Sequence, residues 1–166
     1  MAEQNFTLTT FYENWNKYQE RIKSSVEKLT EEQWGLRASP ELRTVGEIAN
    51  HIVGCRAGWF SHFLKEAASD EVKDIADWDV TGRPPHSPAD TVRALDLTWE
   101  LMANSIARWT PEDMQVTFED DWGEEGGIVH LSRAWVVWHV LEHDLHHGGE
   151  LSLTLGMHGV PANFPG

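Results

Sequence analysis

Four histidines lie within nine residues near the end of the 166-residue chain, at positions 139, 143, 146 and 147. Successive residues of an α-helix are turned by about 100°, so His143 and His147, four residues apart, have their side chains on the same side of a helix. Two imidazoles at this spacing can bind one metal ion. The segment is hard to explain by packing alone, and it predicts a metal site.

On a helical wheel these histidines and Glu150 form one polar stripe on an otherwise apolar helix. Burying such groups without partners is costly, so the stripe must face water, a partner or an ion. His139 and His146 are expected beside the site or at the surface, because adjacent imidazoles rarely reach one ion from a straight helix. Glu150 is expected to orient a ligand imidazole or to act as a general base, with a solvated surface acid as the alternative.

His51 is the candidate third ligand, because it interrupts the apolar run of residues 48–53. A lone histidine on an apolar face is usually a hydrogen-bonded core residue. Together with the later pair, however, it would give three nitrogen ligands and leave positions open for water or substrate, as in catalytic sites. Three imidazoles accept zinc, nickel, cobalt, iron or copper. Cys55, one turn away, could be a soft ligand or a nucleophile, but a small buried thiol is the favoured interpretation.

Residues 143–147 also resemble the HExxH motif of zinc peptidases, with Asp144 in place of the glutamate. No acidic residue follows Glu150, so the usual downstream carboxylate ligand is missing. This disfavours a peptidase.

Four long helices are expected to position these residues. Apolar residues recur at steps of three and four over residues 8–29, which predicts an amphipathic helix. A capping box at Thr44 starts a second helix, expected over residues 45–68, and Ser87 followed by proline starts a third, to about residue 109. Residues 131–157 are apolar nearly all round, which predicts a helix buried by its own bundle and by a partner subunit.

The connections complete an all-α prediction. Residues 70–85 are expected to form a long connection with one short helix inside it, covering one end of a cleft. Residues 116–127 are expected to form a loop or a small hairpin, because their acidic residues lack the spacing of a calcium loop. Strand signals are otherwise sparse, so we expect a helical bundle in a single domain, residues 1–166.

Composition excludes several classes of function. The formal net charge is −14, from 27 acidic and 13 basic side chains, which disfavours binding to nucleic acids and to anionic membranes. No signal peptide or membrane-spanning run is evident, and Cys55 is the only cysteine, so a cytoplasmic location is expected. The nine tryptophans are expected to be core or dimer-interface anchors.

The chain resembles the DinB/YfiT-like family of metal-dependent enzymes over essentially its whole length. Two segments carry the resemblance: residues 46–52, which contain His51, and a late helix with histidines at 139, 143 and 147 followed by residues 148–151. The latter resembles the family's frequent HxxxHRGQ ending, with Gly148 where arginine is common and Glu150 where glutamine is common. The resemblance implies an up-down-down-up four-helix bundle, often a homodimer, with a long connection between the second and third helices.

The resemblance also implies a divalent ion, usually zinc or nickel, held by His51, His143 and His147. Family members include transferases and isomerases that use low-molecular-weight thiols such as bacillithiol or mycothiol. Gly148 removes the cationic side chain next to the site, and with it any anion contact that the usual arginine would make.

Three hypotheses follow for a chain that acts on a small-molecule substrate. The first is a thiol S-transferase in which the ion favours the thiolate and Glu150 or water assists proton movement. The second is a hydrolase in which the same ion activates water. The third is a non-catalytic bundle that binds metal or a partner in stress response, which predicts a saturated coordination shell or an empty histidine stripe.

Overall fold

The computed structural model of this chain describes residues 6–79, 83–122 and 126–164. Within these ranges the fold is mostly helical, with one small antiparallel sheet. The elements follow in the order α1 (Phe6–Val26), α2 (Glu31–Trp34), α3 (Val45–Ala57), the π-helical turn η1 (Gly58–Phe63), α4 (Asp70–Ile75), α5 (Pro88–Arg108), the 3-10 turn η2 (Asp113–Gln115), β1 (Thr117–Asp121), β2 (Ile128–Ser132) and α7 (Arg133–Met157).

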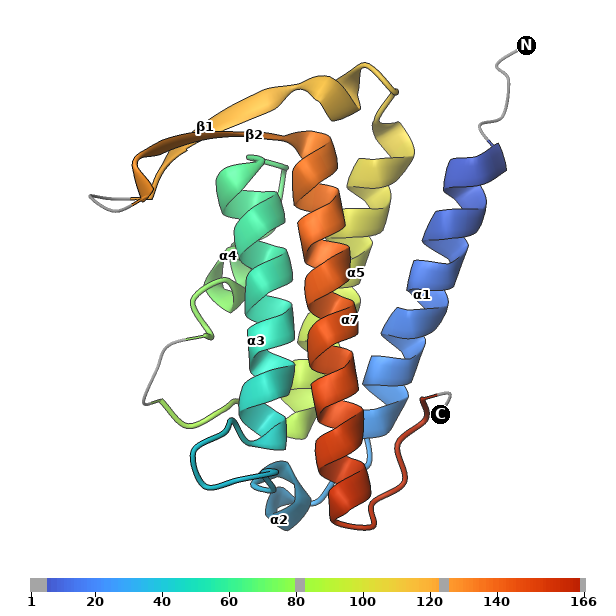
Figure 1. Cartoon of the computed structure of the whole chain (residues 1–166), viewed down its shortest axis with the longest axis vertical. Coiled ribbons are helices and arrows are strands. Elements are labelled where there is room, and N and C mark those ends of the chain that lie inside the picture. The colour runs from blue at the N-terminus through green and yellow to red at the C-terminus, as the bar shows by residue number, and fades with distance from the viewer. Residues whose placement is uncertain (1–5, 80–82, 123–125, 165–166) are drawn as a thin grey trace.

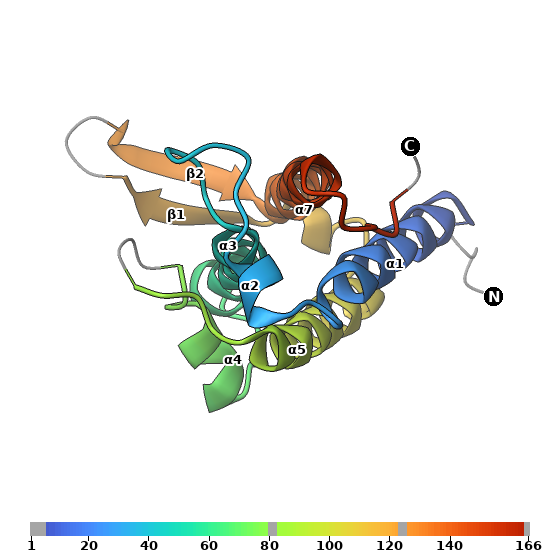
Figure 2. The same ribbon diagram turned by 90° about the horizontal axis from the view of Figure 1, so that it is seen from below.

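The four longer helices of the described residues lie side by side. Figure 1 shows α1 and α7 running in one direction and α3 and α5 in the other. Helix α3 packs against α5 and α7, and α1 packs against the same two helices. Viewed along the helices, α3 and α1 therefore lie on opposite sides, with α7 and α5 between them (Figure 2). The N-terminal half of α1 diverges from α7 (Figure 1).

Local capping explains where the helices begin. Thr44 accepts a hydrogen bond from the amide of Glu47 at 3.1 Å, and the Glu47 carboxylate accepts one from the amide of Thr44 at 2.6 Å. At the start of α5 the hydroxyl of Ser87 accepts a hydrogen bond from the amide of Asp90 at 3.2 Å, and a proline is the first helical residue. Both predicted helix starts are confirmed, because each depends on contacts within one turn.

The ends of two helices differ from the prediction. The α-helical part of the second helix ends at Ala57 and continues as η1 to Phe63, whereas we expected a helix to residue 68. The apolar pattern continues through this stretch, so the widening to a π-helical turn leaves no mark on the periodicity. The first helix ends at Val26 rather than at residue 29.

The all-α prediction needs one correction, a hairpin between α5 and α7. Strands β1 and β2 are antiparallel, with Thr117 opposite Ser132 and Asp121 opposite Ile128. The expected loop at residues 116–127 is therefore partly strand, and the last helix begins at Arg133, not at residue 131. Residues 123–125 of that loop, like residues 80–82 of the expected connection, lie outside the described residues. The short helix expected within residues 70–85 is α4.

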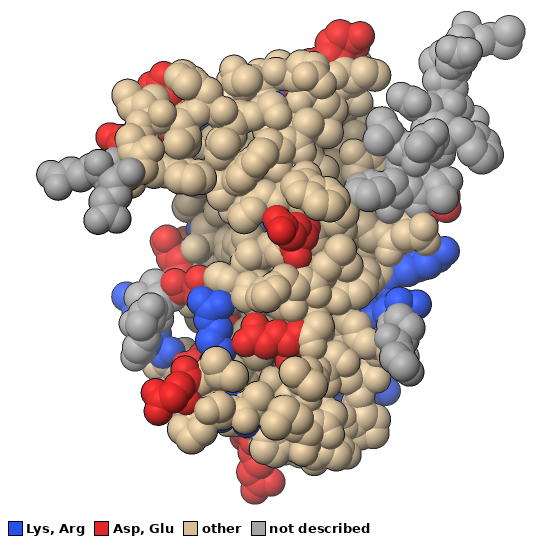
Figure 3. All heavy atoms as spheres, viewed as in Figure 1, with Lys and Arg blue, Asp and Glu red and all other residues tan. Residues whose placement is uncertain are grey.

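None of the helices in the described part of the chain has the length and apolar character that crossing a bilayer requires. Figure 3 shows one face of the molecule on which uncharged residues predominate and acidic side chains form small separate groups.

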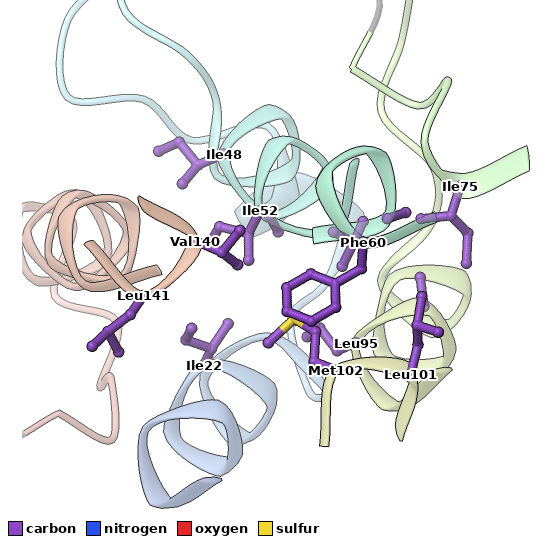
Figure 4. Packing of buried hydrophobic residues seen from close by; sticks show 14 of the residues in the cluster. Ile22, Ile48, Ile52, Phe60, Ile75, Leu95, Leu101, Met102, Val140 and Leu141 are labelled. Carbon is purple, nitrogen blue, oxygen red and sulfur yellow. The ribbon is translucent and has the colours of Figure 1, made fainter. Parts of the chain in front are cut away.

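The hydrophobic core joins all four longer helices with η1 and α4. Figure 4 shows large apolar side chains from these elements meeting in the interior, among them Ile22 of α1, Ile52 of α3, Phe60 of η1, Met102 of α5 and Val140 of α7. Burying each such side chain contributes about 1.5–3 kcal/mol. The tryptophan prediction is met only in part, since Trp15 and Trp34 are buried while others, such as Trp138, are exposed.

Candidate metal centre

Three histidines from two helices meet between α3 and α7. His51 lies on α3 and His143 and His147 lie on successive turns of α7, and one ring nitrogen from each lies within 4.8 Å of the others. The Nε2 atoms of His51 and His143 are 2.8 Å apart. The three ring centroids are separated by 4.4 to 4.5 Å. The structure thus brings together the three residues that the sequence singled out as ligands.

Carboxylates back two of the three imidazoles. Asp79 Oδ2 lies 2.6 Å from Nδ1 of His51, and Glu150 Oε2 lies 2.8 Å from Nδ1 of His147. A carboxylate that accepts the Nδ1 proton leaves the Nε2 lone pair of the same ring free for a cation. The expected orienting contact of Glu150 is present. Asp79 was missed, because nothing in its local sequence distinguishes it from the other acids of its connection.

The Nδ1 atom of the third imidazole, His143, is buried and has no hydrogen-bond partner. A buried polar atom without a partner is rare and needs an explanation. Its ring is held instead by the short contact between Nε2 atoms, which places it toward the point where the three rings converge.

The donor set suits a divalent transition metal. Zinc–nitrogen bonds of about 2.0–2.1 Å at tetrahedral angles place two ligand nitrogens roughly 3.3 Å apart. The 2.8 Å between the facing atoms of His51 and His143 would need to open only slightly to admit an ion. Imidazoles whose other nitrogen is held by a carboxylate are the usual form of such ligands. These residues therefore fit the group that the sequence predicts.

The electrostatics of the site favour neutral imidazoles. Burial, with added repulsion from the two neighbouring histidines, lowers the pKa of His143 to about 2. Burial also lowers the pKa values of His51 and His147, against the opposing effect of their carboxylate partners. Neutral rings carry the lone pairs that a metal ion requires.

Comparison with known proteins shows the family and the fold of the chain. The model of the DinB family matches residues 1–163. The chain belongs to the DinB family. Its structure is similar to that of a DinB-like protein from Bacillus cereus, with a TM-score of 0.65 and 18% identity over 94% of both chains. It is also similar to a conserved protein from Enterococcus faecalis, with a TM-score of 0.63 and 14% identity over 93% of this chain and 99% of that one. No curated protein matches this chain.

The structure explains why this DinB protein has glycine at position 148. A Cβ atom there would overlap the Tyr18 side chain of α1, whose hydroxyl donates a hydrogen bond to the carbonyl of Leu145 at 3.2 Å. Gly148 therefore permits the close approach of α1 to α7, and α7 runs through this position without a break. A side chain at position 148 would have to displace the Tyr18 ring.

The remaining histidines of α7 lie outside the central group. His139 stacks on Trp135 with ring centroids 4.9 Å apart, and it contacts the edge of Trp59. His146 is exposed beside His147. His146, His147 and Glu150 form a second set of potential ligand atoms. His139 thus belongs to an aromatic layer one turn above the site, and His146 to the surface.

Cys55 is a neutral thiol. Burial raises its pKa strongly, and the nearby charge of Asp144 adds to this effect. It lines a hollow of about 470 Å³ beneath the hairpin, together with Trp59 and His62 of η1 and the acidic pair Glu119 and Asp120 of β1. A protonated thiol is a weak nucleophile and a poor ligand, which disfavours both of those roles, but Cys55 is half-buried rather than fully buried as expected.

A buried ion pair fixes the helices that carry the ligands. Arg56 of α3 donates to Asp144 of α7 through Nε at 2.9 Å and through a terminal nitrogen at 2.7 Å, and both side chains are 0% exposed. Trp15 donates to the same carboxylate at 2.7 Å, and Gln19 accepts from Arg56 at 2.6 Å. This network of α1, α3 and α7 sets the register that brings His51 to the histidine pair. Sequence reasoning had considered Asp144 only as part of the peptidase motif.

A larger hollow, of about 620 Å³, lies elsewhere. It is lined mainly by apolar side chains of α1, α5 and the segment after α5, including Trp99, Trp109 and Met114. None of the three central histidines lines it. The three central histidines and this apolar hollow are therefore separate in the fold.

Proposed function

We propose that this chain is a metal-dependent enzyme whose divalent ion, zinc or nickel with iron and cobalt as alternatives, is held by His51, His143 and His147. One observation carries the proposal: three neutral imidazoles from α3 and α7 converge, and two of them are oriented by carboxylates. Three protein ligands leave coordination positions for a substrate, as in catalytic sites.

The metal assignment is tested by elemental analysis of untagged protein after repletion with zinc or nickel. Stoichiometric metal is expected in the wild type, with loss of metal in His51→Ala and His143→Ala. His130→Ala is the matched control, because His130 lies exposed on the hairpin and is not part of the central group. Wild-type protein without bound metal after repletion would contradict the assignment.

The reaction proposed is transfer of a low-molecular-weight thiol to an electrophilic substrate, in a chain that works in the cytoplasm. A bound divalent ion supplies a Lewis acid that lowers the pKa of a coordinated thiol. The chain's own thiol, Cys55, is held protonated, so the nucleophile must come from solution. Glu150, already hydrogen-bonded to His147, would take up the thiol proton.

Turnover of monochlorobimane with cysteine, bacillithiol or mycothiol tests this reaction. The thiolate sulfur forms a bond to the bimane carbon while chloride leaves, and fluorescence reports the product. Metal-dependent and thiol-dependent turnover is expected. Metal-dependent hydrolysis of ester probes without thiol would indicate the hydrolase instead, and no turnover of either kind with a saturated metal would indicate a non-catalytic binding protein.

We further propose that α1, α3, α5 and α7 form an up-down-down-up four-helix bundle and that α7 mediates a homodimer. The pairwise packing of the helices and their directions support the bundle. The outer face of α7 supports the dimer: Trp138, Leu145 and Leu153 are 45 to 63% exposed, and a Cβ at Gly149 or Gly156 would meet nothing. Two copies with a net charge of −14 each repel least where uncharged faces meet.

The dimer proposal is tested by sedimentation velocity. Wild-type protein is expected at twice the chain mass, and Leu145→Glu combined with Leu153→Glu at the mass of one chain. Glu100→Gln, at an exposed position of α5, is the control for a change at a helix surface outside the proposed interface. A monomeric wild type would contradict the proposal.

A further inference from the structure

Asp79 contacts the histidine site from a third part of the chain, outside α3 and α7. Its carboxylate is 2.6 Å from Nδ1 of His51 across 28 positions of sequence, in the segment that follows α4. Glu150 reaches His147 from within the same helix, three residues away. Among the described residues, Asp79 is therefore the one acid that reaches the central histidines from outside α3 and α7.

The residues that lead up to Asp79 are held in place. Ile75, at the end of α4, is 1% exposed. Trp78 stacks on His86 with ring centroids 3.8 Å apart and planes inclined by 12°. The amide of His86 in turn donates to the side chain of Asn50, the neighbour of His51, at 2.8 Å. Asp79 thus follows directly on residues that are packed in the core and on His86.

Gly54 makes this packing close. A Cβ at Gly54 would lie 3.3 Å from the Cβ of Asp79 and 3.5 Å from its backbone nitrogen. Gly54 lies three residues after His51, so the absence of a side chain at Gly54 leaves space on the side of α3 that carries the imidazole. By contrast, a Cβ at Gly58, one turn further along, would meet nothing within 4 Å.

We propose that Asp79 is a positioning residue of the metal site, which holds the proton of His51 on Nδ1 and aims Nε2 at the point shared with His143 and His147. This inference rests on the proposed metal site. A neutral imidazole has two tautomers and can rotate about its side-chain bonds, and only one tautomer and one orientation present Nε2 as a ligand. The carboxylate of Asp79 selects both through one hydrogen bond, and Gly54 lets that carboxylate come near enough to form it.

The first experiment measures metal binding. Cobalt affinity, by competition with a chromophoric chelator, is expected to fall by about 10–100-fold in Asp79→Ala and less in Asp79→Asn, which keeps an acceptor oxygen. Asp77→Asn is the matched control. Asp77 has the same charge, lies two residues before Asp79 at an exposed position, and is not the hydrogen-bond partner of His51. Gly54→Ala is expected to weaken cobalt binding while Gly58→Ala leaves it unchanged.

The second experiment needs no metal. Long-range nitrogen–proton correlation spectra of the metal-free protein report the tautomer of each histidine. Wild-type His51 is expected with its proton on Nδ1, and Asp79→Ala with a mixture of tautomers. An unchanged tautomer together with wild-type cobalt affinity in Asp79→Ala would overturn the positioning role, whereas wild-type cobalt affinity in His51→Ala would overturn the metal site itself.

Discussion

Two polar layers join α3 to α7, and they differ in how completely their groups are paired. In the layer of Arg56 and Asp144 both charged side chains are 0% exposed, they bond to each other, and two further side chains donate to or accept from them. In the histidine layer, one turn away, His143 has a buried nitrogen without a partner and two Nε2 atoms face each other. A fully paired layer can only hold helices together. A layer whose imidazole nitrogens have unused lone pairs can bind a cation, but its unpaired buried groups lower the free energy of unfolding.

The largest effect is expected from breaking the paired layer. Asp144→Ala leaves Arg56 buried without a counter-charge, and removing one partner of a buried pair costs about 3–5 kcal/mol in the free energy of unfolding. Urea denaturation of the metal-free protein measures it. The double variant Arg56→Met with Asp144→Leu should lose much less, because no charge is left unpaired. A loss below about 1 kcal/mol in Asp144→Ala would mean that this layer is not the structural one.

The histidine layer should respond to pH. In the native protein the pKa of His143 is about 2, below its ordinary value of 6.5, so between these values the unfolded chain binds a proton that the folded chain does not. Stability is therefore fully present above pH 6.5 and falls on acidification, by at most about 1.4 kcal/mol per pH unit for this group. Urea denaturation in EDTA at pH 7.0 and 5.5 is the measurement. The dependence should be shallower in His143→Gln, and an equal slope would contradict the assignment.

At neutral pH the same histidine should matter little for folding. His143→Gln removes a buried nitrogen that has no partner, so the unfolding free energy of the metal-free protein is expected to change by less than about 1 kcal/mol. Metal binding should be lost in the same variant. A loss as large as that of Asp144→Ala would remove the distinction between the two layers.

The smallest effect is expected at Cys55, which lies between the layers on α3. Because its thiol is protonated, Cys55→Ser should change the rate of thiol transfer by less than roughly twofold, and iodoacetamide should not label the folded protein at pH 7.5. Mass spectrometry after alkylation checks the second point. Rapid labelling would show an ionised thiol and would reopen its role as nucleophile.

The sequence alone determined those features that depend on contacts within a few residues. The capping box at Thr44 and the Ser87 cap followed by proline placed the starts of α3 and α5, and helical periodicity placed His143 and His147 on one side of α7. The predicted extent of the second helix was wrong, and the all-α prediction needed the correction of one small hairpin, because η1 and the hairpin occur in stretches whose apolar pattern is also compatible with helix or loop.

Only the tertiary structure decided which polar residues meet. Arg56 and Asp144 are 88 positions apart, and His51 and Asp79 are 28 apart, so neither pair leaves a spacing in the sequence that could reveal it. Which acid reaches which base depends on how α3, α4 and α7 pack, down to the one missing side chain at Gly54. Helix formation is local and can be derived from neighbours along the chain, whereas the orientation of a ligand imidazole depends on partners that only folding brings near.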